Sequence, residues 1–551
     1  MRQAALIGGV ASALALTVNA QALTRPPPAN GASATSVDAA DTSWADGADS
    51  GAMGAWLAGF SGAFSSSEGC DPGETAIKPG EGAMETRRRL TDIVSACTAA
   101  IKTRNASSEV GLALRIRARA YFRLGDLERA VADDTAALAT DLGRSHEAAA
   151  GVLQDRALAY MGLQNYDHAV ADDSAALQAN PSLNKIGVAH ILQNRAVAYQ
   201  HLGKSDNAAD DFKKAVKLDP NGHLSVEMLI ALAGIDEQRH QNDAAIADYS
   251  AVLKLNTTEV RAWIGRAYAE RNKGDRAAAA TDARKAIMLD STSAPAHRLL
   301  AELLIASGRP KEAAEESERA IQGDPKDATA LALGADAALA AGDRDAAIAG
   351  YSHALAIDPR LTSALNNRGV AYLGKGDYPH AVEDFTAAIA LNANQATAWT
   401  NRGIARVALR DEIEAEADFN QALQLDPDDA EALRQRAGLE EANGLYAAAA
   451  NDYGRSVAID PSDEDAFRGK GFAELSLHRY DAAVADLSAA IAQNPKDAAA
   501  YRFRANAYAG RNDNSLALAD YATWRRLDPN APPETEAPAK ATWARNPSGQ
   551  H

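Results

Sequence analysis

Small and hydrophobic residues in the middle of the chain recur with a period of 34 residues. When each repeat is numbered from its start, position 20 is alanine in all twelve repeats, position 8 is alanine or glycine, and position 27 is alanine in nine repeats. Small residues at positions 8 and 20 allow two antiparallel helices to lie close together. Position 27 allows the next repeat to pack against the second of these helices. The pattern therefore predicts a stack of helical hairpins.

Prolines mark the end of many repeats and help to fix the register. The repeats start at residues 111, 150, 189, 226, 260, 294, 328, 362, 396, 430, 464 and 498. The first three steps are longer than 34, which predicts insertions near 143–149, 182–188 and 221–225. Position 32 is often proline, which ends the second helix because it lacks a backbone N–H, as at Pro325, Pro359, Pro427, Pro461, Pro495 and Pro529.

Two further positions have a characteristic composition. Glycine is frequent near position 15, where a short turn joins the two helices. Position 24 is aromatic in seven repeats, at Phe212, Tyr249, Tyr351, Phe385, Phe419, Tyr453 and Tyr521. These larger side chains fill the space that the small residues leave between the helices.

The combined pattern resembles that of the tetratricopeptide repeat family over residues 111–531. This resemblance implies an all-α, right-handed superhelical solenoid of about twelve helix-turn-helix units. It also implies that the first helix of each unit lines a concave groove, and that the protein binds peptides or proteins. No unit can bury its apolar face alone, so stacking creates a continuous core.

The segments outside the repeats differ in composition. Residues 1–22 are predicted to be a secretory signal peptide, residues 23–69 a low-complexity and mostly disordered segment, and residues 532–551 a disordered tail. Residues 70–110 are predicted to form an N-terminal cap, with a helix at 84–104 and a partial repeat in which 93–101 correspond to positions 20–28. Trp56, Phe60 and Phe64 recur every four residues, so this segment packs on the folded body, docks on a partner or plugs the groove.

Composition narrows the possible partners and the compartment. The 551 residues carry a formal net charge of −18, which argues against nucleic-acid binding. No membrane span is expected after removal of the signal peptide. The chain is predicted to be exported, to the periplasm or beyond the cell, and the short signal and alanine-rich sequence are typical of bacteria. The sequence does not predict an oligomeric state.

The chain has two cysteines, Cys70 and Cys97. In an exported protein they are predicted to form a disulfide, although two unpaired thiols or a metal site are alternatives. No metal or cofactor is predicted, because two cysteines without a paired histidine are weak grounds for one. No catalytic motif is found, so the chain is predicted not to be an enzyme.

Position 7 is basic in nine repeats, and each of these repeats has aspartate at position 23. The residues are Arg117 and Asp133, Arg156 and Asp172, Arg195 and Asp211, Arg266 and Asp282, Arg368 and Asp384, Arg402 and Asp418, Arg436 and Asp452, Lys470 and Asp486, and Arg504 and Asp520. This concurrence predicts structural ion pairs between the two helices or between neighbouring repeats, rather than contacts with a ligand.

Positions 2, 5, 6, 9 and 13 are the candidate groove positions, by analogy with peptide-binding members of the family. Position 5 carries Arg434, Arg468 and Arg502 in three successive repeats, and position 6 carries Asn194, Asn367 and Asn401. Arginine can hold carboxylates with two hydrogen bonds, and asparagine can bond an extended backbone. The arginines are predicted either to contact an acidic ligand or to form a basic stripe that balances neighbouring acids.

The sequence therefore predicts a non-enzymatic scaffold that captures a peptide or protein segment in its groove. The alternative is a structural component or assembly factor of a cell-envelope complex, which would act through its convex face and tails.

Overall fold

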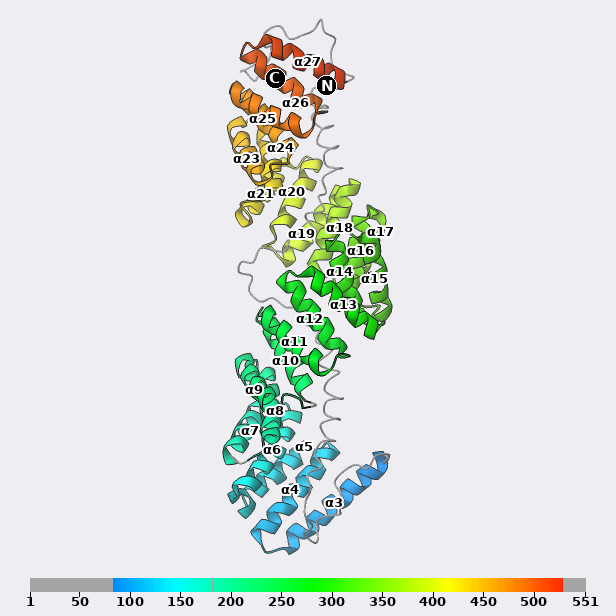
Figure 1. The fold of residues 1–551 in the computed structure, drawn as a ribbon, viewed down its shortest axis with the longest axis vertical. Coiled ribbons are helices and arrows are strands. Elements are labelled where there is room, and N and C mark those ends of the chain that lie inside the picture. Colours follow the sequence, from blue (N-terminus) through cyan, green and yellow to red (C-terminus); the bar gives the residue numbers. More distant parts are fainter. Residues whose placement is uncertain (1–82, 181–182, 223, 529–551) are drawn as a thin grey trace. The chain divides into compact units, whose positions relative to one another are not determined.

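The computed structural model describes residues 83–180, 183–222 and 224–528. Over these ranges the chain forms α-helices and one short 3-10 helix, η2 (Asp141–Arg144), with no β-strand (Figure 1). The chain divides into two compact units between Ser291 and Thr292. The described part before this division is called the first body here, and the part after it the second body.

The first body begins with a single helix, α3 (Ala83–Thr103), which five helical hairpins follow. These are α4 (Ser107–Leu124) with α5 (Leu127–Leu138), α6 (His146–Gly162) with α7 (Tyr166–Ala179), α8 (Lys185–His201) with α9 (Ser205–Leu218), α10 (Ser225–Gln238) with α11 (Asn242–Leu255), and α12 (Val260–Lys273) with α13 (Arg276–Leu289). Each helix packs mainly on the helices next to it in the sequence.

The second body consists of seven hairpins. They are α14 (Ala294–Ala306) with α15 (Pro310–Gly323), α16 (Ala328–Ala340) with α17 (Arg344–Ile357), α18 (Thr362–Lys375) with α19 (Tyr378–Leu391), α20 (Ala396–Leu409) with α21 (Glu412–Leu425), α22 (Ala430–Ala442) with α23 (Tyr446–Ile459), α24 (Glu464–Ser476) with α25 (Tyr480–Gln493), and α26 (Ala498–Gly510) with α27 (Asn514–Leu527). The predicted all-α solenoid of about twelve hairpins is confirmed.

The turn inside each hairpin uses one left-handed residue, always at position 15. Seven of these residues are glycines, with φ between 68° and 96°. The other five are Gln164, His240, Arg410, His478 and Asn512, with φ between 57° and 67°. Glycine is frequent at this position because the left-handed conformation costs other residues free energy.

The small residues lie at the helix contacts, as predicted. Every alanine at position 20 is at most 3% exposed, and most are fully buried. Gly369, at position 8, lies against a bulky side chain of its own repeat: a Cβ there would lie 2.7 Å from the ring of Phe385. Trp524, at position 27 of the last described repeat, is an exception to the small residues at this position and is half-buried.

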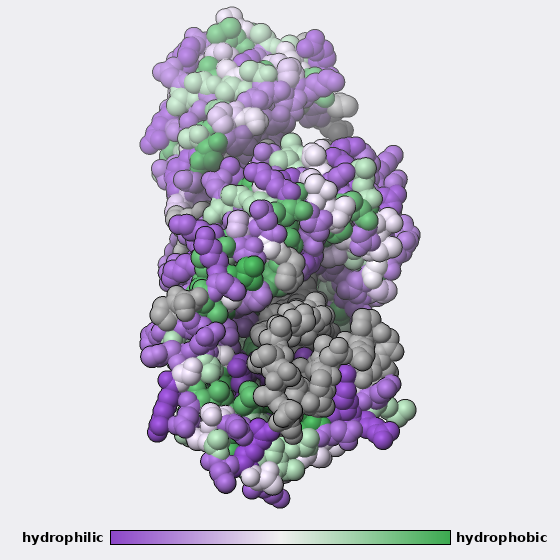
Figure 2. Space-filling view, turned by 60° about the horizontal axis from the view of Figure 1, so that its bottom comes forward, coloured by the Kyte–Doolittle hydropathy of each residue, from purple (hydrophilic) through white to green (hydrophobic). Residues whose placement is uncertain are grey.

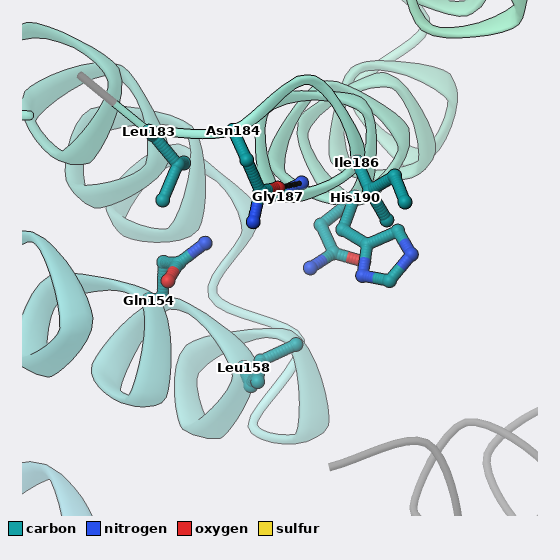
Figure 3. A pocket seen from close by; sticks show the side chains of 8 residues that line it. Gln154, Leu158, Leu183, Asn184, Ile186, Gly187 and His190 are labelled. Carbon is teal, nitrogen blue, oxygen red and sulfur yellow. Dashed lines mark hydrogen bonds between the residues drawn. The ribbon is translucent and has the colours of Figure 1, made fainter. Parts of the chain in front are cut away.

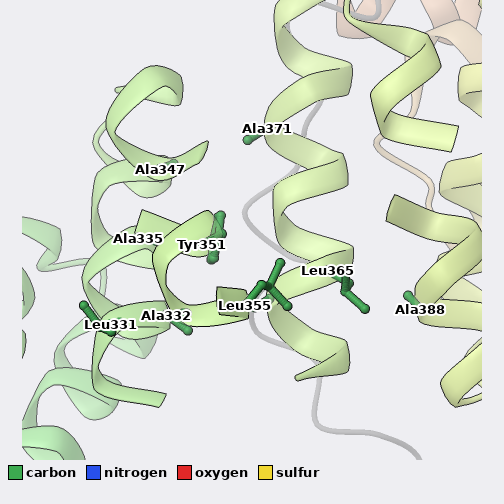
Figure 4. Close-up of a cluster of buried hydrophobic side chains, with 11 residues drawn as sticks. Leu331, Ala332, Ala335, Ala347, Tyr351, Leu355, Leu365, Ala371 and Ala388 are labelled. Carbon is green, nitrogen blue, oxygen red and sulfur yellow. The ribbon is translucent and has the colours of Figure 1, made fainter. Parts of the chain in front are cut away.

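Within the second body, one part of the core extends over successive repeats. In the second body, one cluster joins Leu331 and Ala335 of α16, Tyr351 of α17 and Leu365 of α18 (Figure 4). Tyr351 is fully buried at the aromatic position 24. Because each repeat contributes to the core of the next, the hairpins stabilise one another.

Several boundaries differ from the sequence-based ones. Helix α4 begins at Ser107, so the expected limit between cap and repeats at 110/111 falls inside a helix. The insertions near 143–149 and 182–188 contribute the end of η2 and the extra first turns of α6 and α8. The predicted cap helix is present as α3, shifted by one residue.

The signal peptide, the low-complexity segment with Trp56, Phe60 and Phe64, and the tail at 532–551 lie outside the described residues, and so does Cys70. Their predictions stay predictions. Among the helices that the structure describes, none is both long and apolar enough to cross a membrane.

Candidate functional site

All nine predicted pairs between position 7 and position 23 are present as ion pairs within a repeat. The closest distance in each pair is 2.5–3.0 Å. In most of them the guanidinium uses Nε and Nη2 to bond both carboxylate oxygens, as in Arg368 with Asp384. The aspartates are nearly buried. These side chains therefore join the two helices of a hairpin and are not available for a ligand.

The remaining guanidinium nitrogen, Nη1, joins each of these arginines to the preceding repeat. It donates over 2.7–3.1 Å to the side-chain oxygen at position 25 of the helix before, which belongs to Thr98, Thr135, Ser174, Ser250, Ser352, Thr386, Asn420 or Ser488. One arginine thus connects three helices. Thr98 lies on α3, so α3 takes the place of a second helix in the cap.

Sequence reasoning missed the role of position 25, although a signal was present. Where position 7 is lysine, at Lys470, position 25 of the preceding repeat is Gly454. Where position 7 is Leu232 or Gly334, position 25 before it is Lys213 or Glu318. A hydroxyl or amide side chain at position 25 occurs only together with the arginine that uses it.

Two of the three predicted position-5 arginines lie close to carboxylates. Arg434 Nη2 donates to Glu431 over 2.6 Å, and its Nε lies 3.2 Å from Oδ2 of Asp463. Arg468 pairs with Asp465 in the same way, and its Nη1 donates to Asp497 over 3.0 Å. The guanidinium groups of Arg434 and Arg468 are therefore already held by this chain.

Asp463 and Asp497 have a second role as N-caps of the next first helix. Oδ1 of Asp463 accepts the backbone N–H of Ala466 over 3.0 Å, and Oδ1 of Asp497 accepts that of Ala500 over 3.1 Å. Each carboxylate thus begins one helix and binds the arginine of the previous repeat. This geometry favours the interpretation in which the arginines balance neighbouring acids.

Arg502 differs from the other two arginines. It is exposed, and within the described residues no carboxylate is paired with it. Its guanidinium lies 4.9 Å from the ring centre of Phe503 and 5.7 Å from that of Trp524. Phe503 in turn lies 4.7 Å from the ring of Phe472. The last repeat thus presents a cation beside aromatic rings.

Two of the three predicted asparagines belong to one polar network. Asn367 donates to Asp336 over 2.9 Å and is bonded to Asn366, which accepts from Asn401 over 3.5 Å. Burial raises the pKa of Asp336, and the hydrogen bonds from Tyr351 and Asn367 oppose that rise. These amides hold one another and are only half-buried.

Asn194, in the first body, lines a cavity of about 270 Å³ between α6 and α8 (Figure 3). The other lining residues are Gln154, Leu158, Leu183, Asn184, Ile186, Gly187 and His190. Gln154, Leu158, His190 and Asn194 occupy groove positions 5, 9, 2 and 6 of two successive repeats. The structure thus brings together residues from the positions that the sequence predicted to line the groove.

Half of this cavity was not predictable from the repeat pattern. Leu183, Asn184, Ile186 and Gly187 come from the insertion at 182–188, which interrupts the period of 34. Ile186 is 54% exposed, although its side chain is apolar. Asn184 caps α8 by accepting the N–H of Gly187 over 2.7 Å. The insertion therefore adds an apolar rim to a cavity with amide groups.

A group of charged side chains lies on α4 and α6. Nε of Arg115 and Nε of Arg119 donate to the same oxygen of Asp155, over 2.7 and 2.8 Å. Although burial opposes ionisation, Arg119 and Arg115 hold the pKa of Asp155 below its ordinary value. Asp155 follows Gln154 on α6, so the charges and the cavity share one helix.

Asp134 and Asp173 occupy position 24 in the first two repeats, where many other repeats have an aromatic residue. The sequence analysis did not identify them. They are 1% and 0% exposed, and both oxygens of Asp173 lack a hydrogen bond. Burial raises the pKa of Asp134 to about 9, and Asp155 adds to this effect. Both carboxyls are therefore held in environments that favour the protonated form.

The described residues contain no group of histidine, cysteine, aspartate and glutamate side chains that could hold a metal ion. Cys97 is fully buried on α3, and its predicted partner Cys70 lies outside the described ranges. On the face shown in Figure 2, hydrophobic residues form small groups between hydrophilic ones. The cavity beside Asn194 is the candidate site considered below, because it brings together groove positions of two successive repeats.

Comparison with known proteins agrees with the repeat geometry. Tetratricopeptide repeat models match residues 189–221 and 362–395, residues 400–464 and 469–532, and residues 304–367. No curated protein matches the chain at a significant level.

Solved structures similar to this chain have low sequence identity to it. The anaphase-promoting complex structure Cut9–Hcn1 is 16% identical, covers 81% of this chain and 92% of that chain, and has a TM-score of 0.40. A tetratricopeptide repeat protein from Parabacteroides merdae is 17% identical, covers 46% and 99%, and has a TM-score of 0.39. Yeast Tom70 is 16% identical, covers 76% and 92%, and has a TM-score of 0.33. The family models, together with the twelve hairpins, show that the chain belongs to the tetratricopeptide repeat family.

Proposed function

We propose that the protein is a non-enzymatic scaffold that holds an extended peptide segment of a partner protein in the groove of its first body. The observation that carries this proposal is the cavity between α6 and α8. Its volume of about 270 Å³ is below the range typical of sites for drug-sized ligands. It suits one side chain of a peptide better than a whole metabolite.

The chemistry of the lining supports a peptide. Leu158, Leu183 and Ile186 offer apolar contacts, while the amides of Gln154 and Asn194 can donate to and accept from a peptide backbone. An extended segment exposes one side chain and two backbone groups per residue, which matches this mixture. The partner of this cavity is therefore a segment with a bulky apolar residue.

Export to the periplasm is part of the same proposal, and it rests on the sequence of residues 1–22. The signal peptide and the predicted disulfide point to an oxidising compartment. The partner is then another exported protein.

Site-specific photocrosslinking tests the proposal. A benzophenone amino acid replaces Leu158 or Ile186 in the full chain, and Met288, which is 76% exposed on α13, serves as the matched apolar control. We expect crosslinks to a partner from the two cavity positions and none from the control. Removal of the amide in Asn194→Ala should weaken the crosslink. Equal crosslinking from all three positions would contradict the proposal.

A further inference from the structure

Position 24 inserts a side chain between the first helices of two successive repeats. A Cβ on Gly369, at position 8 of the same repeat, would lie 2.7 Å from the ring of Phe385. A Cβ on Gly265, at position 6 of the next repeat, would lie 2.2 Å from Cζ of Tyr249. A side chain at position 24 is therefore directed from the second helix of a hairpin into the space between these two first helices.

Where position 24 is tyrosine, its hydroxyl meets side chains of the groove positions. Tyr351 donates to Asp336, at position 9 of its own repeat. Asn367, at position 6 of the next repeat, donates to the same carboxyl over 2.9 Å. Two further repeats have such a pair over 3.3 Å, with the carboxyl at position 12: Tyr249 with Glu237, and Tyr453 with Glu441. Over the described residues, a tyrosine hydroxyl and a carboxyl thus pair in this space in three repeats.

The second repeat has the carboxyl without the ring. Its position 24 is Asp173, which is 0% exposed, and neither of its oxygens has a hydrogen bond within the described residues. The positions that correspond to Asp336 and Asn367 are Leu158 and Asn194, and both line the cavity between α6 and α8 (Figure 3). By the equivalence of the repeats, Asp173 therefore lies behind these two side chains, at the inner end of the cavity.

The charged side chains around Asp173 have partners of their own. Arg156 bonds both oxygens of Asp172, and Arg195 bonds both oxygens of Asp211. Burial raises the pKa of Asp173, and Arg195 opposes this effect. Because a buried carboxyl without a hydrogen bond is unfavourable, a donor that enters through the cavity would stabilise Asp173.

We propose that the cavity takes a tyrosine side chain of the partner segment, whose hydroxyl donates to Asp173. This inference rests on the proposed function, because it names the side chain that the same cavity would hold. The ring lies against Leu158 and Leu183, and the hydroxyl reaches the carboxyl once the half-buried amide of Asn194 turns aside, a rotamer change of a kind that is common on binding. The partner thus supplies the pair that other repeats form within the chain.

Tyrosine suits this site better than other large side chains. Its ring buries a large apolar area and carries one donor at the far end, which matches Leu158 and Leu183 at the wall and Asp173 behind them. Phenylalanine would fill the same space but leave the carboxyl without a donor. Lysine would bring an ammonium group close to Arg195 and would have to bury its charge.

Two small molecules that mimic these side chains test the selectivity: p-cresol for tyrosine and toluene for phenylalanine. Their dissociation constants for the full chain are measured by saturation-transfer NMR. Binding in the cavity is the part that is abolished by Leu158→Trp, whose larger side chain fills the space. We expect p-cresol to bind there about ten-fold more tightly than toluene. Equal affinity, a preference for toluene, or no binding that Leu158→Trp removes overturns the proposal.

Variants of Asp173 assign the preference to its carboxyl. Asp173→Leu removes the acceptor, so p-cresol should lose its advantage over toluene, whereas Asp173→Asn keeps an acceptor oxygen and should keep the preference. Asp210→Leu, at an exposed position of α9, is the matched control and should bind both molecules like the wild type. Circular dichroism shows whether each variant folds. A preference for p-cresol that persists in Asp173→Leu assigns the hydroxyl to Gln154 or Asn194 and overturns the role of Asp173.

These outcomes are distinguishable from failure of the proposed function. The photocrosslinks at Leu158 and Ile186 report a partner segment whatever its side chain. If they form while p-cresol shows no preference over toluene, the cavity holds a different side chain and only the present proposal fails. If the preference is found without crosslinks, the selectivity for tyrosine is supported and the capture of a partner protein is what fails.

Discussion

Arg402 and Asp418 lie sixteen residues apart in the chain and face each other across one hairpin. Nε and Nη2 of Arg402 donate to the two oxygens of Asp418 over 3.0 and 2.7 Å. The side chains are 10% and 2% exposed. A pair so well shielded from water joins α20 to α21 and leaves neither charge for a ligand.

Removal of one partner of this pair should lower the stability of the protein. Arg402→Ala leaves Asp418 buried with Arg406 as its remaining cation, and loss of one partner of a buried pair typically costs about 3–5 kcal/mol. We expect a loss of that order in the free energy of unfolding, measured with urea. The control is Arg319→Ala, whose side chain is 50% exposed and whose loss should cost less than about 1 kcal/mol. Equal losses would show that burial does not decide the effect.

Glycine should be required at residue 369, where the ring of Phe385 fills the space. A Cβ at residue 369 would lie 2.7 Å from Phe385, whereas a Cβ at Gly234 meets nothing within 4 Å. We expect Gly369→Ala to lower stability by about 1–3 kcal/mol through overpacking. Gly234→Ala, also inside a helix, should be neutral or stabilising by up to about 1 kcal/mol. Thermal unfolding of the two variants distinguishes these outcomes, and a stabilised Gly369→Ala would contradict the packing argument.

Substitution by glycine should stabilise the protein where position 15 carries another residue. Gln164 has a φ of 57° at position 15, where most repeats have glycine. We expect Gln164→Gly to raise the free energy of unfolding by roughly 0.5–1 kcal/mol, because glycine adopts this conformation without steric cost. The reverse change, Gly342→Ala at a φ of 85°, should lower it. Calorimetry on both variants gives the comparison, and changes of the same sign would argue against a backbone cause.

Asp173 should make stability depend on pH. Burial raises its pKa well above the ordinary value, Arg195 opposes this effect, and Asp172 and Asp211 add to it. The unfolded carboxyl ionises near pH 4. As the pH rises above that value the unfolded chain loses its proton first, so the free energy of unfolding falls.

Asp173→Asn removes this titration. We compare the free energy of unfolding of the variant with that of the wild type at each pH. This difference should be more than about 1 kcal/mol more favourable to the variant at pH 8 than at pH 4. The exposed residue Asp210 provides the control variant, Asp210→Asn, which should gain nothing. Urea unfolding at the two pH values measures the difference, and a gain that does not change with pH would assign the effect to packing.

Substitution of the position-5 arginines should affect stability to different extents. Arg468→Ala removes the contact to Asp497, which caps α26, and we expect a loss of about 1–2 kcal/mol. Arg502→Ala, in the last repeat, should change stability by no more than about 0.5 kcal/mol. Binding of an acidic peptide by the second body, if it occurs, should depend on Arg502. A stable Arg468→Ala that has lost such binding would instead support a ligand role for Arg468.

Only some residues of the candidate site could be predicted from the sequence. Asn194 was predicted at a groove position and lines the cavity, whereas Ile186 was not, because it lies in an insertion outside the repeat period. Asn367 and Asn401 were predicted as ligand contacts, and the structure places them in a network with Asp336 and Asn366. A repeat pattern identifies positions, but it does not show which neighbours already occupy a polar group.

The sequence by itself determined the hairpins, their number and their turns. Alanine at positions 8 and 20, the left-handed residue at position 15 and the proline at position 32 act within one repeat, where local sterics fix the geometry. Only the tertiary structure decided which of the position-5 arginines are neutralised. Asp463 and Asp497 lie 29 residues after the arginine that they bind, at the junction where each caps the first helix of the next repeat. Whether such residues meet depends on how one hairpin stacks on the next, because an ion pair forms only at contact distance.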